Sequence, residues 1–152
     1  AIGAPVDTVF EFWSNFSNYP KFMSYIRSVE IDDHGGLRWT AIAPGRTHIQ
    51  WNTTLFDLRL NQRIAWKSIR GSVIATEGVI HLVPTELQGT LLRVELSYAP
   101  PFGALGYAVG HFLGFDPRSR IDEDIEVMKL LIESQARENT PSRGVGRPPT
   151  PP

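Results

Sequence analysis

Residues 27–98 have β-strand character almost throughout, and the links that interrupt them are short. The predicted strands include residues 37–43, 47–58, 63–69, 75–83 and 90–98, and residues 32–36 (DDHGG) form a turn before the first of these. Parallel neighbours would need crossovers of roughly a dozen residues or more. Links this short therefore predict an antiparallel sheet in which consecutive strands pair.

Amphipathic helices are predicted before the strands. After Pro5, apolar residues recur at the i, i+3, i+4, i+7 spacing of one helix face. They are Val6, Val9, Phe10 and Trp13, with Phe12 and Phe16 beside them. Residues 17–20 (SNYP) should end this helix, because the residue before a proline disfavours helical backbone. A second short helix is expected to follow, with Phe22, Met23 and Ile26 on its apolar side.

A long helix is predicted after the strands, from about residue 116 to residue 138. Asp116 is suited to its N-cap and Pro117 to its first turn. Its apolar stripe consists of Ile121, Ile125, Met128 and Ile132, with Leu131 beside it. Two helices, a run of strands and a final helix are typical of an α+β domain whose helices pack on one face of an antiparallel sheet.

Composition limits the kinds of molecule that this chain is expected to bind. The chain has 152 residues, of which 41% are hydrophobic, which suits one globular domain with its own core. The net charge is −1 and no basic stripe is evident, so we expect no nucleic-acid partner. There is no cysteine and no paired-histidine motif, so neither a metal nor another cofactor is expected. The longest apolar run, residues 99–115, falls short of the roughly 18 residues of a membrane span.

The two ends of the chain differ from its body. Residues 140–152 (TPSRGVGRPPTPP) lack apolar periodicity and predict a Pro-rich tail, which leaves residues 1–139 as the domain. The chain starts at Ala1 without a signal-peptide pattern, so the compartment cannot be read from this end, and a cytoplasmic location is favoured.

A series of motifs runs in order along residues 2–134. They are APVDTVF (4–10) followed by Trp13, YPKFM (19–23), RIAWKS (63–68), YAPP (98–101) followed by Gly103 and Leu105-Gly106, and the helix that begins Asp116-Pro117. Together they resemble the polyketide cyclase/dehydrase-like branch of the START-like (SRPBCC) superfamily. That family usually begins with a full edge strand, whereas only residues 1–3 precede the Ala-Pro turn here. The first strand is therefore expected to be short or truncated.

The resemblance implies a helix-grip fold, in which an antiparallel sheet wraps around a long C-terminal helix, with two short N-terminal helices and an internal ligand cavity. It implies no particular ligand, because its members include lipid carriers, quinone-binding proteins and aromatic cyclases.

Side-chain alternation along the strands indicates which residues face such a cavity. The expected lining is Trp39, Trp51, Thr53, Leu55, Trp66, Ser68, Ile80, Leu82, Val94, Leu96 and Tyr98 from the strands, with Ile125 and Met128 from the helix. An apolar concavity with a few hydroxyl and indole groups suits a small molecule. The other interpretation is a filled core in which the tryptophans leave no space.

Acid–base groups are scarce at the inward positions. His48 and His81 are expected on the outer face, which leaves Tyr98 and His111 as weak catalytic candidates. We therefore favour binding or carriage of a small hydrophobic molecule (a lipid, a quinone or a polyketide-like aromatic) over catalysis. The alternative is a polyketide cyclase/dehydrase-type enzyme, a lyase-like activity based on cavity hydroxyl and imidazole groups. Those groups are Thr53, Ser68, Tyr98 and His111.

Residues 99–115 are apolar and contain glycine at every fourth position from Gly106 to Gly114. Each glycine lowers helix stability by about 1 kcal/mol, which would suit a lid over the cavity or a contact with a membrane surface. The lid candidates are Leu105, Val109 and Phe112. Close packing on the sheet edge is the alternative. A homodimer, or a protein partner that meets this segment or the Pro-rich tail, is a further option.

Overall fold

The structure, a computed structural model, describes residues 1–43, 47–72, 74–99 and 120–140. In chain order its elements are α1 (Val6–Ser14), the 3₁₀ helix η1 (Phe16–Lys21), β1 (Ile26–Ile31), β2 (Gly36–Ala43), β3 (Thr47–Arg59), β4 (Arg63–Ser68), β5 (Ala75–Pro84), β6 (Thr90–Ala99) and α3 (Ile121–Glu138). The strands form one sheet in their sequence order, and each pairs antiparallel with the next. The predicted α+β helix-grip architecture is therefore confirmed.

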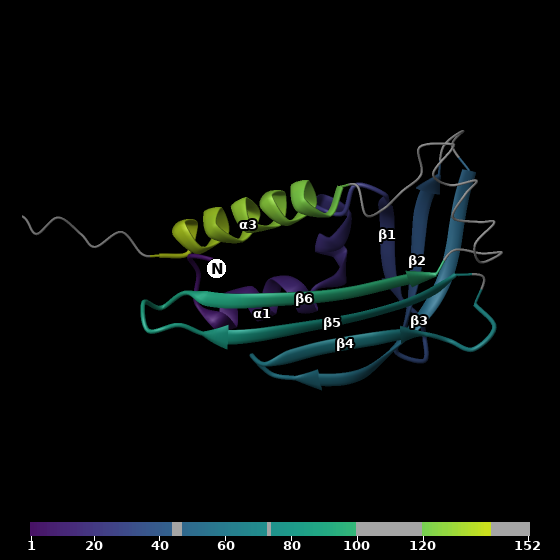
Figure 1. Cartoon of the computed structure of the whole chain (residues 1–152), viewed down its shortest axis with the longest axis horizontal. Coiled ribbons are helices and arrows are strands. Elements are labelled where there is room, and N and C mark those ends of the chain that lie inside the picture. Colours follow the sequence, from purple (N-terminus) through teal and green to yellow (C-terminus); the bar gives the residue numbers. More distant parts are fainter. Residues whose placement is uncertain (44–46, 73, 100–119, 141–152) are drawn as a thin grey trace, which may run out of the picture.

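The sheet is strongly bent, and α1 and α3 lie on its concave side (Figure 1). In this view β1 and β2 stand upright at the right and β4, β5 and β6 run across the picture beneath α3, while the long strand β3 bends from the first direction into the second. The register shifts between Leu55 and Asp57 on β3 and between Ile26 and Ser28 on β1. An extra residue of this kind bends a strand and increases its twist, which helps the sheet to curl around the helix.

The second short helix lies earlier than predicted. Residues 16–21 form η1, which contains the segment expected to break the helix, and the side chain of Asn15 accepts a hydrogen bond from the Ser17 backbone at its start. Capping of this kind satisfies a backbone N–H that the helix itself leaves unpaired. Ile26 was expected on that helix but begins β1, where it pairs with Ala41 of β2. Pairing with a neighbouring strand outweighs the local helical spacing here.

The final helix begins at Ile121, with Arg120 as a cap residue whose side chain makes no capping hydrogen bond. Asp116 and Pro117, the predicted start, lie outside the described residues. Three acidic side chains occupy the first turn, where the positive end of the helix dipole favours them. No helix in the described part of the chain is long and apolar enough to cross a membrane.

The N-terminal segment joins the sheet through a single bridge instead of a full strand. Ile2 and Thr90 exchange two backbone hydrogen bonds, of 2.8 and 2.9 Å. The Thr90 hydroxyl, which is fully buried, also donates to the Ala4 carbonyl at 2.8 Å. This bridge places the start of α1 beside the β5–β6 hairpin. Of the predicted Pro-rich tail, residues 141–152 lie outside the described part.

Tyr19 lies at the centre of an aromatic cluster beneath the concave face. Its side chain is fully buried, and its hydroxyl donates to the Trp13 carbonyl at 2.9 Å. The rings around it have centroids 5.4 to 6.1 Å away and belong to Trp13, Phe16, Phe22, Trp39 and Trp66. Burial raises the pKa of Tyr19 well above its ordinary value, so the hydroxyl stays protonated. The cluster joins α1 and η1 to the tryptophans of the sheet.

Gly78 of β5 makes room for the Trp66 indole. The two residues are paired across β4 and β5, and a Cβ atom on Gly78 would lie 2.1 Å from Cζ2 of Trp66. Since real Cβ atoms do not come so close to a ring, the indole can lie flat against the sheet only because this position has no side chain.

The middle turns of α3 anchor the helix. Met128 and Ile132 are buried in the core, and the Glu133 carboxylate accepts a hydrogen bond from the Gly3 backbone at 2.8 Å. Leu130, on the opposite side of the helix, is 61% exposed. The apolar stripe predicted from the sequence therefore packs inward along these turns.

We expect Ile132→Ala to lower the free energy of unfolding by about 2–5 kcal/mol, because it leaves a cavity under α3. Leu130→Ala, on the exposed side of the same helix, should change it by less than about 0.5 kcal/mol. Urea unfolding followed by circular dichroism measures both. Equal losses in the two variants would contradict the described orientation of α3.

We expect Gly78→Ala to destabilise the protein by about 1–3 kcal/mol, because the new methyl group overpacks against Trp66. In a Trp66→Leu background the same substitution should cost much less, since the obstructing ring is gone. Unfolding of all four members of this double-mutant cycle gives the coupling energy. An unchanged penalty without the indole would show that the two residues do not clash.

Candidate functional site

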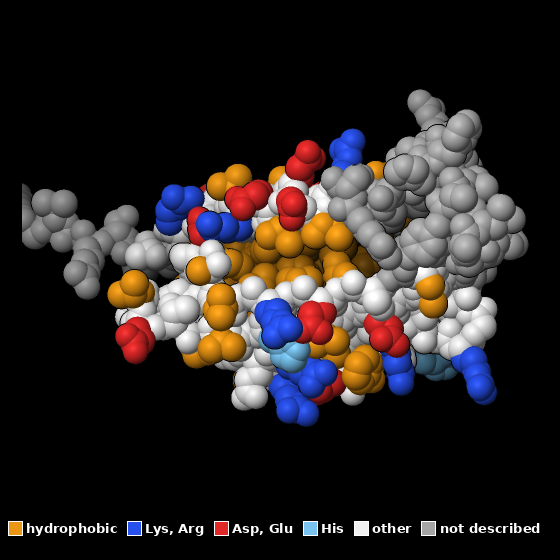
Figure 2. Space-filling view, in the orientation of Figure 1, with side chains coloured by type: hydrophobic (Ala, Val, Ile, Leu, Met, Phe, Trp, Pro, Cys, Tyr) orange, Lys and Arg blue, Asp and Glu red, His pale blue; other side chains and the backbone are white. Residues whose placement is uncertain are grey.

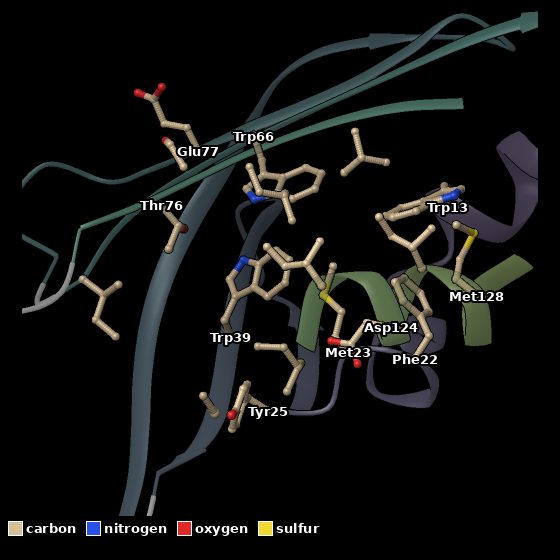
Figure 3. A pocket seen from close by; sticks show the side chains of 18 of the residues that line it. Trp13, Phe22, Met23, Tyr25, Trp39, Trp66, Thr76, Glu77, Asp124 and Met128 are labelled. Atoms are coloured by element: carbon tan, nitrogen blue, oxygen red, sulfur yellow. The ribbon is translucent and has the colours of Figure 1, made fainter. Parts of the chain in front are cut away.

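A pocket of about 190 Å³ lies between α3 and the inner face of the sheet. Figure 2 shows it as a hydrophobic hollow between the helix and β6, and Figure 3 shows side chains converging on it from both sides. The described residues that line it are Trp13, Phe22, Met23, Tyr25, Ile26, Trp39, Ala41, Trp51, Trp66, Ile74, Thr76, Glu77, Val94, Leu96, Ser97, Ile121, Asp124, Ile125 and Met128. Of the two interpretations drawn from the sequence, the structure has the open cavity.

Three tryptophans form the sheet side of this pocket. Trp39 and Trp51 are directly paired across β2 and β3, and their rings stack with centroids 5.9 Å apart and planes 7° apart. Trp66 leans on Trp39 from β4, with centroids 5.6 Å apart. All three are buried, so they present a continuous apolar wall to the pocket.

Two of these indoles use their N–H groups within the protein. Trp39 donates to the Thr53 hydroxyl at 2.8 Å, and Trp51 donates to the Thr76 hydroxyl at 3.1 Å. A buried N–H without a partner costs free energy, so these bonds fix the orientation of the rings. The indole nitrogen of Trp13 has no hydrogen-bond partner, although the atom is buried. In Figure 3 it lies on the far side of its ring from Trp39 and Trp66.

The opposite wall comes from α3 and from the segment between η1 and β1. Ile121, Ile125 and Met128 approach the pocket from the helix, while Phe22 and Met23 approach from the segment. Met128 is fully buried, but Ile125 is 39% exposed and Leu96 of β6 is 46% exposed. The hollow in Figure 2 lies between this helix and this strand, so the partly exposed pair flanks its opening.

Two carboxylates belong to the pocket, and they differ in orientation. Asp124 on α3 accepts hydrogen bonds from the backbone N–H of Ser24, at 3.2 Å, and from its hydroxyl. This link joins the start of the helix to the segment before β1. Glu77 is exposed, and its side chain extends away from the indoles in Figure 3. No lysine, arginine or histidine occurs among the described lining residues, and no three metal-ligating side chains gather in the described part of the chain.

The structure brings together part of the lining expected from the sequence. Seven of the expected residues line the pocket: Trp39, Trp51, Trp66, Val94, Leu96, Ile125 and Met128. Five others are absent from its lining: Thr53, Leu55, Ser68, Ile80 and Leu82. Thr53 accepts from the Trp39 indole, and Ser68 turns toward the backbone carbonyls of Ile74 and Thr76. Alternation predicts which face of the sheet a residue occupies, but it does not predict which part of that face borders the pocket.

Most of the expected catalytic and lid residues are not among the residues that the structure describes. His111, Leu105, Val109 and Phe112 lie outside the described residues. Tyr98 lies in β6 opposite Thr76, and its side chain is not among those described. The two hydroxyls expected to act with them, on Thr53 and Ser68, are engaged elsewhere.

Sequence reasoning missed several lining residues, and two of them carried a usable signal. Thr76 shares a strand face with Gly78 and Ile80 by alternation, so it could have been placed inward. Asp124 precedes Met128 by four residues, so the two share a helix face. Tyr25 and Ile74 carried no such signal, because they lie in irregular links whose direction the sequence does not give.

Comparison with known proteins agrees with this geometry. Residues 2–125 match the family described as "Polyketide cyclase / dehydrase and lipid transport". An uncharacterised 17.2 kDa protein from the melC2-rnhH intergenic region of Streptomyces lincolnensis is 25% identical over 143 residues, which cover 94% of this chain and 92% of the relative.

Solved structures share the fold. Protein DR_A0006 from Deinococcus radiodurans superposes with a TM-score of 0.71 and 28% identity, covering 88% of this chain and 92% of that one. The ZhuI aromatase/cyclase from Streptomyces sp. R1128 gives a TM-score of 0.65 at 14% identity, covering 94% and 93%, and this likeness concerns the fold alone. Since the family match spans most of the folded part, the chain belongs to the polyketide cyclase/dehydrase and lipid transport family of START-like proteins, as the order of its motifs predicts.

Proposed function

We propose that this protein binds and carries a small, flat, hydrophobic molecule in the pocket between α3 and the sheet. The observation that carries the proposal is the wall of three buried indoles facing an open, mainly apolar space. Flat aromatic faces stack well on flat ligands, and an empty apolar cavity gains free energy when an apolar molecule fills it.

The volume of the pocket limits the size of the molecule. Pockets for drug-sized ligands measure roughly 300–1,000 Å³, whereas a cavity of about 150 Å³ holds benzene. A cavity of about 190 Å³ suits a compound of one or two rings. An aromatic or quinone-like compound has this size and the flat shape that stacks on indoles.

A cyclase/dehydratase activity is the second candidate, and Asp124 is the observation that favours it. Its carboxylate lies in the pocket wall, where a base could take a proton from a keto compound. The family description and the fold shared with an aromatase/cyclase support the same idea. Binding without catalysis is favoured because two of the four expected catalytic groups, Thr53 and Ser68, make hydrogen bonds inside the protein instead.

We expect Ala41→Leu to weaken ligand binding at least tenfold while the protein remains folded, because the larger side chain would occupy the pocket that Ala41 lines. Ala75→Leu, at an exposed position of β5, is the matched control and should leave binding unchanged. Titration with 2-acetylnaphthalene, followed by the four indole N–H signals in ¹H–¹⁵N NMR spectra, gives the dissociation constants. Equal affinities in both variants would place the ligand elsewhere, and the absence of any indole shift would refute the proposal.

A further inference from the structure

We propose that the ligand is a neutral aromatic ketone or quinone whose carbonyl oxygen accepts a hydrogen bond from the Thr76 hydroxyl. This inference rests on the proposed function and assigns the polar contact that would select among flat hydrophobic molecules. It concerns the end of the pocket formed by the first residues of β5, next to the indole wall.

Thr76 is placed to meet a ligand. It shares the inner face of β5 with Gly78, against which Trp66 lies, and it is half-buried in the pocket lining. Figure 3 shows Thr76 on the same side of the pocket as Trp66 and Trp39. A flat molecule lying on these indoles would bring an edge substituent toward this hydroxyl.

Among the described residues, the hydrogen-bond pattern leaves the Thr76 hydroxyl proton available. The Thr76 oxygen accepts from the Trp51 indole at 3.1 Å, and a hydroxyl still has one proton to donate. Its other hydrogen-bond contact among the described residues is the Ser68 hydroxyl at 3.4 Å, beyond the usual 2.5–3.0 Å range of O–H···O bonds. That Ser68 oxygen already accepts the Thr76 backbone N–H at 2.6 Å.

The Trp51 bond also makes Thr76 a better donor. A hydroxyl that accepts one hydrogen bond is polarised and donates the next one more strongly. Trp51 therefore acts as a positioning residue that holds the Thr76 oxygen. Two hydrogen bonds in series would then link the Trp51 indole N–H, the Thr76 hydroxyl and the ligand carbonyl.

Charge argues for a neutral ligand. The described lining carries the carboxylates of Asp124 and Glu77 and no basic side chain. A carboxylate ligand would lose hydration without gaining a cationic partner, which is costly in an apolar site. A ketone offers the same acceptor oxygen at a much smaller cost of desolvation.

Three ligands of matched shape test the inference. They are 2-acetylnaphthalene, its hydrocarbon analogue 2-isopropenylnaphthalene, and the anion 2-naphthoate. Dissociation constants come from ¹H–¹⁵N NMR titration of the full chain and of three variants. The first two are Thr76→Val, which removes the hydroxyl at constant shape, and Thr76→Ser, which keeps it. The third is the control Thr54→Val, on the outer face of β3.

In the native protein the ketone should bind roughly three- to tenfold more tightly than the hydrocarbon, as one net hydrogen bond implies. Naphthoate should bind more weakly than the ketone. Thr76→Val should reduce the ketone-to-hydrocarbon ratio to about one, and Thr76→Ser should restore it. Thr54→Val should leave it unchanged. Because the ratio is taken within each variant, general damage to the pocket cancels.

The outcomes separate this inference from the proposed function. If ketone and hydrocarbon bind but their ratio is one in the native protein, or survives Thr76→Val, the Thr76 contact is overturned while the aromatic pocket stands. Naphthoate binding as tight as that of the ketone overturns the assignment of a neutral ligand. If none of the three binds, the proposed function fails and this inference fails with it.

Discussion

The packing of three indoles against the bent sheet is the constraint on which the rest of the site depends. Trp39 and Trp51 can stack because β2 and β3 place them directly opposite each other, and Trp66 can join them because Gly78 has no side chain. The Tyr19 ring of η1 packs against the Trp39 and Trp66 rings and so connects them to the N-terminal helices. These large side chains pack against one another and against Tyr19, on the sheet side of the pocket, and space remains between them and α3.

The helix completes the pocket because its first turns and its middle are held differently. Its middle is packed through Met128 and Ile132, and Glu133 accepts a hydrogen bond from the Gly3 backbone. In its first turns Ile125 lines the pocket and remains partly exposed. The hydrogen bonds from Ser24 to Asp124 hold this end at a distance from the indoles instead of letting it collapse onto them. A helix anchored at its middle and bridged near its start leaves an open mouth beside β6.

The sequence predicted the fold well because its signals are local and repeated. Alternation along the strands and the i, i+4 stripe of the final helix each recur several times, so single exceptions do not change the answer. The site was predicted less completely. Alternation placed Thr53 and Ile80 on the inner face but could not show that an indole covers Thr53, or that Ile80 lies beyond the pocket along β5. The bulges that bend the sheet, and the link that carries Tyr25, depend on tertiary packing, which no periodicity of the sequence encodes.

Satisfying buried polar groups also limits the chemistry that the pocket can perform. Tyr19 donates to a backbone carbonyl, Thr53 accepts from Trp39, and Ser68 bonds to the backbone around Thr76. Each of these bonds avoids the cost of an unpaired buried group, and none of the three hydroxyl-bearing residues is in the described lining of the pocket. The described walls then offer a ligand mainly apolar surface, with Thr76 and Asp124 among the polar residues of the lining. Such a surface suits the selection of a molecule by shape and by one or two polar contacts, which is the role that we propose for the pocket.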